Sequence, residues 1–140
     1  MESIHFFNEK IDFKLKNKTK IRSWLRRAVH EHDKKVSCIN YIFTSDNYLL
    51  DINRKYLNHN TYTDIITFNQ SSTPKKIEAD IYISIERIQA NSKKLNISFS
   101  EELHRVMIHG LLHLLGYNDK TNPEKDYMRK KENHYLALRT

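Results

Sequence analysis

Glycine and proline are almost absent from this chain, and their scarcity limits the folds that are open to it. Each occurs only twice among 140 residues, whereas average usage would give about 12 per cent for the two together. Collagen-like, low-complexity and turn-rich all-β architectures all need more of them. The composition therefore favours long helices joined by short connections. The length predicts one domain, residues 1–140, that can bury a core without disulfides.

Hydrophobic periodicity divides the chain into short strands and longer helices. Apolar runs predict strands over 4–7, 36–43, 63–68 and 77–85. The last two strands are joined by a polar segment and are expected to form a hairpin. Apolar residues at helical spacing predict helices over 18–31, 46–57, 86–95, 98 to about 117, and 123–138. A mixed start followed by two C-terminal helices predicts one α+β or α/β domain.

The chain is basic, with 24 Lys and Arg against 17 Asp and Glu, a formal charge of +7 and a pI near 9.4. This balance favours polyanionic partners such as RNA, DNA or an anionic membrane surface, although solubility alone would also explain it. The first 35 residues supply +5 of the charge. Arg22, Arg26 and Arg27 share one face of the helix expected over 18–31. They either guide an RNA backbone or form a solvated helix face.

Other features of the sequence bear on the compartment. The single cysteine, Cys38, excludes an intrachain disulfide. The N-terminus lacks the charged and then apolar pattern of a signal peptide, and no apolar run approaches the ~18 residues of a membrane span. We therefore expect a cytoplasmic protein without membrane contact.

The segment that carries chemistry is 107–119, which contains two histidines four residues apart and both glycines of the chain. On a helix, His109 and His113 would differ by about 40° in direction and by one turn in height, so both imidazoles can reach one ion. Gly116 can end the helix in a left-handed conformation, and Asp119 then comes round to the same side. Three such ligands leave an open position, the pattern of a catalytic zinc site.

The spacing His-x-x-x-His-x-x-Gly-x-x-Asp is that of the metzincin metalloproteases, with two changes. Asp119 stands where the metzincin motif has a third histidine. Gly110 stands where these proteases have the glutamate that serves as general base, which argues against ordinary zinc proteolysis. We expect Gly110 to leave space beside the metal that a bulky phosphodiester could occupy.

The same segment, from His109 to Tyr117, resembles the signature of the YbeY family, H-G-x-L-H-L-x-G-Y-D-H. Three upstream stretches are also similar to that family. Residues 53–56 and 63–68 match its N-R-x-Y and T-D-V-L-S-F, and residues 79–84 match its G-D-I-x-I-S. These blocks stand in the right order and cover residues 53 to 119, so the resemblance is specific.

The resemblance implies a small cytoplasmic metal-dependent endoribonuclease of the kind that acts in ribosomal RNA maturation and ribosome quality control. It implies a small mixed sheet flanked by helices, with a metzincin-like metal-binding helix near the C-terminus. It further implies Zn²⁺, one per chain, on His109, His113 and Asp119. The implied substrate is single-stranded RNA, with ribosomal RNA or the small ribosomal subunit as partner.

Two positions depart from the family pattern. Asp119 replaces the usual third histidine. A carboxylate oxygen binds zinc at a similar distance, but its negative charge would weaken the metal as a Lewis acid and raise the pKa of bound water. Leu57 replaces an arginine that is expected to touch RNA phosphate. The nearest positive candidates for that contact are Arg54, Lys55 and His59.

Other polar residues near the motif have more than one interpretation. Asp64 and Asp80 could each orient a motif histidine through its second ring nitrogen, and Asp64 could equally cap a turn. Asn118 and His134 are competing third metal ligands that we rank below the aspartate. His104 lies about 140° around the helix from the first motif histidine, so we expect it to face solvent.

No general base can be assigned from the sequence, and metal-bound water, ionised to hydroxide, is assumed to serve. The expected function is a metal-dependent, single-strand-specific endoribonuclease. One alternative is a non-catalytic, ribosome-associated RNA-binding factor with a structural zinc. Another is a metalloprotease-like hydrolase that lacks the usual glutamate. A fourth protein ligand would favour a structural zinc, whereas an open position favours catalysis.

Overall fold

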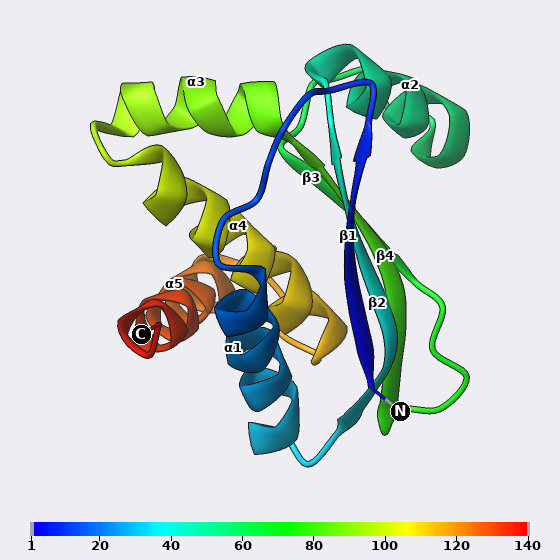
Figure 1. The fold of residues 1–140 in the computed structure, drawn as a ribbon, viewed down its shortest axis with the longest axis vertical. Helices are drawn as coiled ribbons and strands as arrows, with labels where there is room; N and C mark the ends of the chain where they lie inside the picture. The colour runs from blue at the N-terminus through cyan, green and yellow to red at the C-terminus, as the bar shows by residue number, and fades with distance from the viewer. Residues whose placement is uncertain (1, 140) are drawn as a thin grey trace.

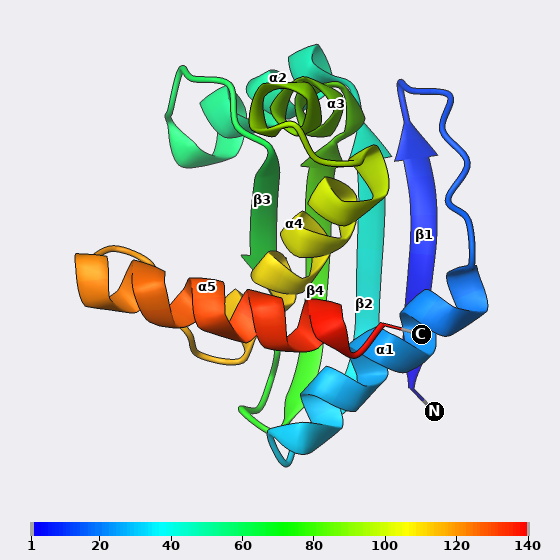
Figure 2. The ribbon, with the colours of Figure 1, turned by 90° about the vertical axis from the view of Figure 1, so that its left-hand side faces the viewer.

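Four strands form a mixed sheet in the order β1-β2-β4-β3. The computed structural model describes residues 2–139. Its strands are β1 (Ser3–Glu9), β2 (Lys35–Thr44), β3 (Ile65–Asn69) and β4 (Lys76–Ser84). The first, second and fourth run parallel, while β3 pairs antiparallel with β4 as the predicted hairpin. The two edges of the sheet are therefore β1 and β3, as Figure 2 shows.

Helices cover both faces of this sheet. They are α1 (Lys18–Glu31), α2 (Asp46–Leu57), α3 (Ile85–Leu95), α4 (Phe99–Leu114) and α5 (Asn122–Ala137). Figure 1 shows α1, α4 and α5 on one face and α2 on the other. The architecture confirms the predicted α+β fold with a small mixed sheet flanked by helices. Within residues 2–139, no helix is both long and apolar enough to cross a membrane.

The larger core lies between the sheet and the layer formed by α1 and α4. Its fully buried side chains include Leu25, Ile39, Ile81, Met107 and Leu111. On the other face, α2 places Leu49 and Ile52 against Ile66 of β3 in a smaller cluster. This packing makes α4 the central helix of the molecule and places it against β3 and β4.

Most predicted element boundaries lie within two residues of the observed ones. The exception is the helix expected to reach about Tyr117, which ends earlier because the chain turns at Gly116, where φ is 107°. The N–H of Gly116 bonds to the carbonyl of His113, and the N–H of Tyr117 bonds to that of Leu112. These two bonds are the Schellman pattern, so the predicted glycine terminus is confirmed.

Candidate metal centre

Three side chains on α4 and in the loop after it lie within reach of one ion. His109 and His113 stand one turn apart, and their Nε2 atoms are 3.0 Å apart. The turn at Gly116 returns the chain so that Asp119 Oδ2 lies 3.3 Å from each Nε2. The three side chains are between 24% and 38% exposed. The centre is therefore open to solvent on one side.

Hydrogen bonds on the far side of each imidazole fix its orientation. His109 Nδ1 lies 2.6 Å from Glu132 Oε2, and His113 Nδ1 lies 2.9 Å from the carbonyl oxygen of Tyr117. An ionised carboxylate and a carbonyl can only accept, so each Nδ1 donates and carries the proton of the neutral ring. Both Nε2 atoms therefore direct lone pairs toward the same point.

The donor set fits a tetrahedral metal ion. Two nitrogen lone pairs that face each other at 3.0 Å repel unless a cation or a proton lies between them. A tetrahedron with arms of ~2.0 Å, the usual Zn–N distance, has edges of about 3.3 Å. The separations of 3.0, 3.3 and 3.3 Å among the donor atoms are close to that value. Two imidazoles and a carboxylate also form a common catalytic zinc ligand set.

Asp119 is the candidate third ligand whose side-chain oxygen lies beside both histidine nitrogens. The competing candidates Asn118 and His134 are exposed, in the loop and on α5 respectively. The group of possible ligands found among residues 2–139 contains three members and no fourth histidine, cysteine or carboxylate. A tetrahedral ion held by these three residues would keep one position for water or substrate.

Glu132, which orients His109, was missed by the sequence analysis. Its side chain is 6% exposed, and its other oxygen accepts from Arg105 Nη1 at 3.0 Å. Burial acts to raise the pKa of Glu132, but the hydrogen bonds from His109 and Arg105 outweigh it and lower that pKa, so the group is ionised. The sequence did contain one indication that Glu132 has a buried partner. Glu132 stands in the apolar stripe of α5 between Met128 and Leu136, where a carboxylate needs a partner.

The electrostatics around His109 favour a cation. Burial acts to lower the pKa of His109, but the hydrogen bond and charge of Glu132, then the charges of Asp119 and Asp64, outweigh it and raise that pKa. The imidazole therefore holds a proton readily when its Nε2 is free. A metal ion at Nε2 would displace this proton and would be attracted by the same carboxylates.

The carbonyl that orients His113 is itself held in place by α1. His32, directly after α1, donates from Nδ1 to the carbonyl of Ala28 at 2.7 Å, so its Nε2 accepts from the Tyr117 hydroxyl, also at 2.7 Å. The two rings meet edge to face with centres 5.5 Å apart. Tyr117 is thus fixed at both its side chain and its carbonyl, which stabilises the loop that carries Asp119.

Neither Asp64 nor Asp80 takes the orienting position considered for it, because Glu132 and the Tyr117 carbonyl bond to the second ring nitrogens. Asp80 accepts from Asn40 Nδ2 at 3.0 Å. It faces away from α4, since alternate residues of a strand point to opposite faces of the sheet. Asp64 lies closer: it lines a cavity together with His109, and burial raises its own pKa.

Gly110 faces the sheet and not the metal centre. A Cβ at this position would lie 2.7 Å from Ile65 Cδ1, 3.4 Å from Thr67 Oγ1 and 3.5 Å from Ile81 Cγ2. The expectation that Gly110 leaves space for a phosphodiester is therefore wrong, because side chains of β3 and β4 fill that space. The glycine instead lets α4 pack closely on the sheet, and a glutamate would not fit here.

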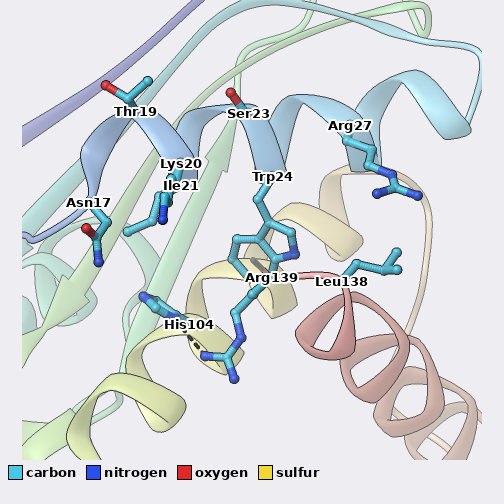
Figure 3. A pocket seen from close by; sticks show the side chains of 10 residues that line it. All are labelled: Asn17, Thr19, Lys20, Ile21, Ser23, Trp24, Arg27, His104, Leu138 and Arg139. Carbon is cyan, nitrogen blue, oxygen red and sulfur yellow. Dashed lines mark hydrogen bonds between the residues drawn. The ribbon is translucent and has the colours of Figure 1, made fainter.

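His104 lies beside a cavity of about 460 Å³ between α1, α4 and the end of α5, shown in Figure 3. The expectation that it faces solvent is wrong, because the side chain is only partly exposed. Its Nδ1 accepts from Arg139 Nη1 at 2.7 Å, and its ring centre lies 5.8 Å from that of Trp24. Burial and the charge of Arg139 lower the pKa of His104 to about 4, so the ring is neutral at physiological pH.

The three α1 arginines considered for RNA binding lie on α1, which crosses from the edge strand β1 to β2. Arg22 Nε donates to the carbonyl of Ile4 at 2.8 Å, and its guanidinium lies 5.1 Å from the centre of the Phe6 ring. Arg27 pairs with a glutamate of its own helix at 3.1 Å. Arg26 Nε is buried without a partner among residues 2–139. Contact of these arginines with RNA stays a prediction.

Arg54, Lys55 and His59 lie at the other edge, at the end of α2 and in the segment that leads into β3. Arg54 Nε donates to Asn60 Oδ1 at 2.6 Å, while Lys55 and His59 are exposed. Leu57, which replaces the family arginine, is 43% exposed in the same region. At the same edge, Ile65 and Thr67 of β3 lie against Gly110 of α4, and Asp64, directly before β3, lines a cavity with His109. Its contact with RNA also stays a prediction.

The fold and the centre together define a class of protein. It is an α+β protein whose central helix presents two histidines, with an aspartate returned to them by a glycine turn, around an open metal-binding position. Comparison with known proteins identifies the family. The model of the family described as Endoribonuclease YbeY matches residues 3–139, and the chain belongs to this family. The resemblance inferred from the sequence motifs is thereby confirmed.

Individual relatives agree with this assignment. A protein named Endoribonuclease YbeY from Cytophaga hutchinsonii is 48% identical over 138 residues, which cover 99% of this chain and 96% of that protein. One of the same name from Amoebophilus asiaticus is 48% identical over 134 residues, or 96% and 91% of the two chains. The solution structure of a Thermotoga maritima protein is similar to this structure, with a TM-score of 0.64. The alignment covers 95% of this chain and 86% of that one. At 24% identity, that likeness supports the fold alone.

Proposed function

We propose that this chain is a Zn²⁺-dependent endoribonuclease that cleaves single-stranded RNA, with one ion held by His109, His113 and Asp119. The observation that carries the proposal is the convergence of their three donor atoms, with both Nδ1 protons directed away from the shared point. Membership of the family supplies the reaction class. Three protein ligands and one open position suit catalysis better than a purely structural zinc.

Each neighbouring residue has a definite part in this proposal. Bound zinc would supply Lewis-acid activation of the scissile phosphate and of the attacking water. Glu132 holds the His109 ring with Nε2 facing the centre, and Tyr117 does the same for His113. Asp119 adds a negative charge that a third histidine would not, which would make the centre a weaker Lewis acid.

The biological setting follows from the family and from the charge of the chain. A net charge of +7 suits a polyanionic substrate. The family resemblance supports a cytoplasmic role in ribosomal RNA maturation and ribosome quality control, with the small ribosomal subunit as partner. The proposal therefore includes ribosomal RNA as the physiological substrate.

Cleavage of an end-labelled single-stranded RNA tests the proposed function. Wild type, His113→Ala and His134→Ala would be purified identically and assayed before chelation, after chelation and after zinc is restored. We expect wild type and His134→Ala to cleave only with metal, and His113→Ala not to cleave. Equal cleavage by all three proteins would reveal a contaminating ribonuclease and contradict the proposal.

The same variants separate catalysis from a structural role. If the zinc is catalytic, His113→Ala should keep most of its RNA binding and most of its melting temperature. A large fall in melting temperature for His113→Ala, with none for His134→Ala, would favour the non-catalytic factor with a structural zinc. Thermal unfolding and equilibrium RNA binding measure the two quantities directly.

A further inference from the structure

A cavity of about 400 Å³ adjoins the metal centre on the side of His109 that carries Nδ1. His109 and Glu132 line it, and they also belong to the metal centre and its support. Val106 and Ile97 contribute apolar side chains to its wall. An RNA strand with one phosphate at the metal centre would therefore have a neighbouring nucleotide within reach of this cavity.

Carboxylates outnumber cations in the polar lining of this cavity. The lining acids are Asp64, Glu101, Glu102 and Glu132, and the lining cations are Arg105 and Arg129. Both guanidinium groups are engaged by Glu132, at 3.0 Å from Arg105 and 3.8 Å from Arg129. The surplus of negative charge lies with the remaining carboxylates, of which Glu102 is buried while Asp64 and Glu101 are partly exposed.

Glu102 is the polar group of this lining whose hydrogen bonding is incomplete. It is 5% exposed, and its Oε1 is buried without a hydrogen-bond donor among residues 2–139. Burial and the charge of Asp64 raise the pKa of this carboxyl group, and N–H donors from a ligand would act in the opposite direction by stabilising its ionised form. A buried acceptor without a donor is unfavourable, so the carboxylate would gain by turning Oε1 toward the cavity when a ligand there supplies N–H groups.

The chemistry of the lining excludes two kinds of ligand. A phosphate would meet more negative than positive charge. A divalent cation would meet two guanidinium groups. In addition, the group of carboxylate and histidine ligands close enough to share an ion, within residues 2–139, is the one at the metal centre. The kind of ligand that still fits this lining is a neutral, planar group with several N–H donors. The nucleobases of RNA are such groups.

We propose that this cavity receives the base of a nucleotide next to the scissile phosphate, and that Glu102 selects guanine. This inference rests on the proposed ribonuclease function. The Watson–Crick edge of guanine presents two parallel N–H donors, N1–H and the 2-amino group, which match the two oxygens of a carboxylate. Adenine and cytosine present an amino group without the adjacent N–H. The apolar side chains of Ile97 and Val106 suit the face of the ring.

Binding of mononucleotides to the zinc-loaded protein tests the base selection without any cleavage. GMP, IMP and AMP would be titrated by calorimetry into wild type, Glu102→Gln and the exposed-site control Asp126→Asn. IMP keeps N1–H but lacks the 2-amino group. We expect GMP to bind wild type and Asp126→Asn about tenfold more tightly than IMP, as for one hydrogen bond to a charged group. Glu102→Gln should lose this difference.

Equal affinities for GMP and IMP in wild type, or no binding of GMP, would overturn the inference. A preference that survives in Glu102→Gln would overturn the role of Glu102. The comparison within wild type needs no substitution, so it remains decisive even if Glu102→Gln folds poorly.

Mapping the bonds cleaved in a mixed-sequence single-stranded RNA separates this inference from the proposed function. We expect cuts to cluster at a fixed position relative to guanine, and replacement of guanine by inosine to slow them about tenfold, the size expected for one hydrogen bond to a charged group. Zinc-dependent cleavage without base preference would contradict the guanine cavity and leave the ribonuclease intact. GMP selection without any RNA cleavage would contradict the ribonuclease alone.

Discussion

The orientation of the first motif histidine depends on one residue, Glu132. Replacing it by glutamine removes the charge that holds the His109 Nδ1 proton and leaves Arg105 without its ion pair. We expect Glu132→Gln to weaken zinc binding by about 10–100-fold, the usual effect of removing a group that orients a metal ligand. Competitive zinc titration would measure the change, with Asp126→Asn as the matched surface control. An unchanged affinity in Glu132→Gln would contradict the orienting role.

Protonation of His109 should set the pH dependence of metal binding. Its pKa in the metal-free protein is raised above the ordinary value, so zinc must displace a proton at any pH below that raised value. Zinc affinity should therefore rise with pH, by up to about tenfold per pH unit for one displaced proton, and level off above that pKa. The free energy of unfolding of the metal-free protein should instead fall as the pH rises. The stability that His109 contributes is complete below its ordinary pKa and is lost as pH rises through the raised value.

Zinc titrations at a series of pH values would measure the change in affinity, and urea unfolding of the metal-free protein at the same pH values would measure the change in stability. A zinc affinity that does not change with pH would contradict protonation of His109 as the competing event.

Among the structural elements, α4 depends on its close contact with β3. Gly110 lies against Ile65 and Ile81, where a glutamate would be overpacked and its charge buried. We expect Gly110→Glu to lower the free energy of unfolding by about 3 kcal/mol or more. Gly110→Ala should cost far less, because the end of the Ile65 side chain can move and alanine favours the helix. Urea denaturation would compare them, and equal stabilities for the two variants would contradict this packing.

The elements of the fold and the three donors of the centre could be predicted because their signals are local. The histidine spacing, the glycine turn and Asp119 all lie within one short segment of sequence. The roles of Glu132, Gly110 and His104 could not be predicted from the sequence, because each depends on contacts with a distant part of the chain. An apolar stripe interrupted by a carboxylate marked Glu132 as unusual, but only the packing of α5 on α4 identifies its partner.

At the scale of the whole molecule, basic residues lie toward both edges of the sheet. Arg54 and Lys55 lie in the last turn of α2, which leads into the edge strand β3, whereas Arg26 and Arg27 lie on α1, which follows the other edge strand, β1. We expect replacement of Arg54 and Lys55 by glutamine to weaken RNA binding and to lessen the slope of log affinity against log salt by about 1.4, as for two lost phosphate contacts.

Replacement of Arg26 and Arg27 by glutamine is the matched comparison, and we expect it to change the salt slope less. Fluorescence anisotropy with a labelled single-stranded RNA over a range of salt would give both slopes. A larger change in the salt slope from replacing the α1 pair would contradict this prediction and would indicate that RNA binds along the β1 edge.

The central claim is that His109, His113 and Asp119 together hold one zinc ion, and equilibrium zinc binding tests it most directly. Wild type and His134→Ala should each bind one ion per chain with the same affinity. Alanine at any one of the three ligands should weaken binding by more than the ~10–100-fold expected for loss of an orienting residue. Wild-type affinity in all three alanine variants, or no zinc binding by the folded wild type, would contradict the account.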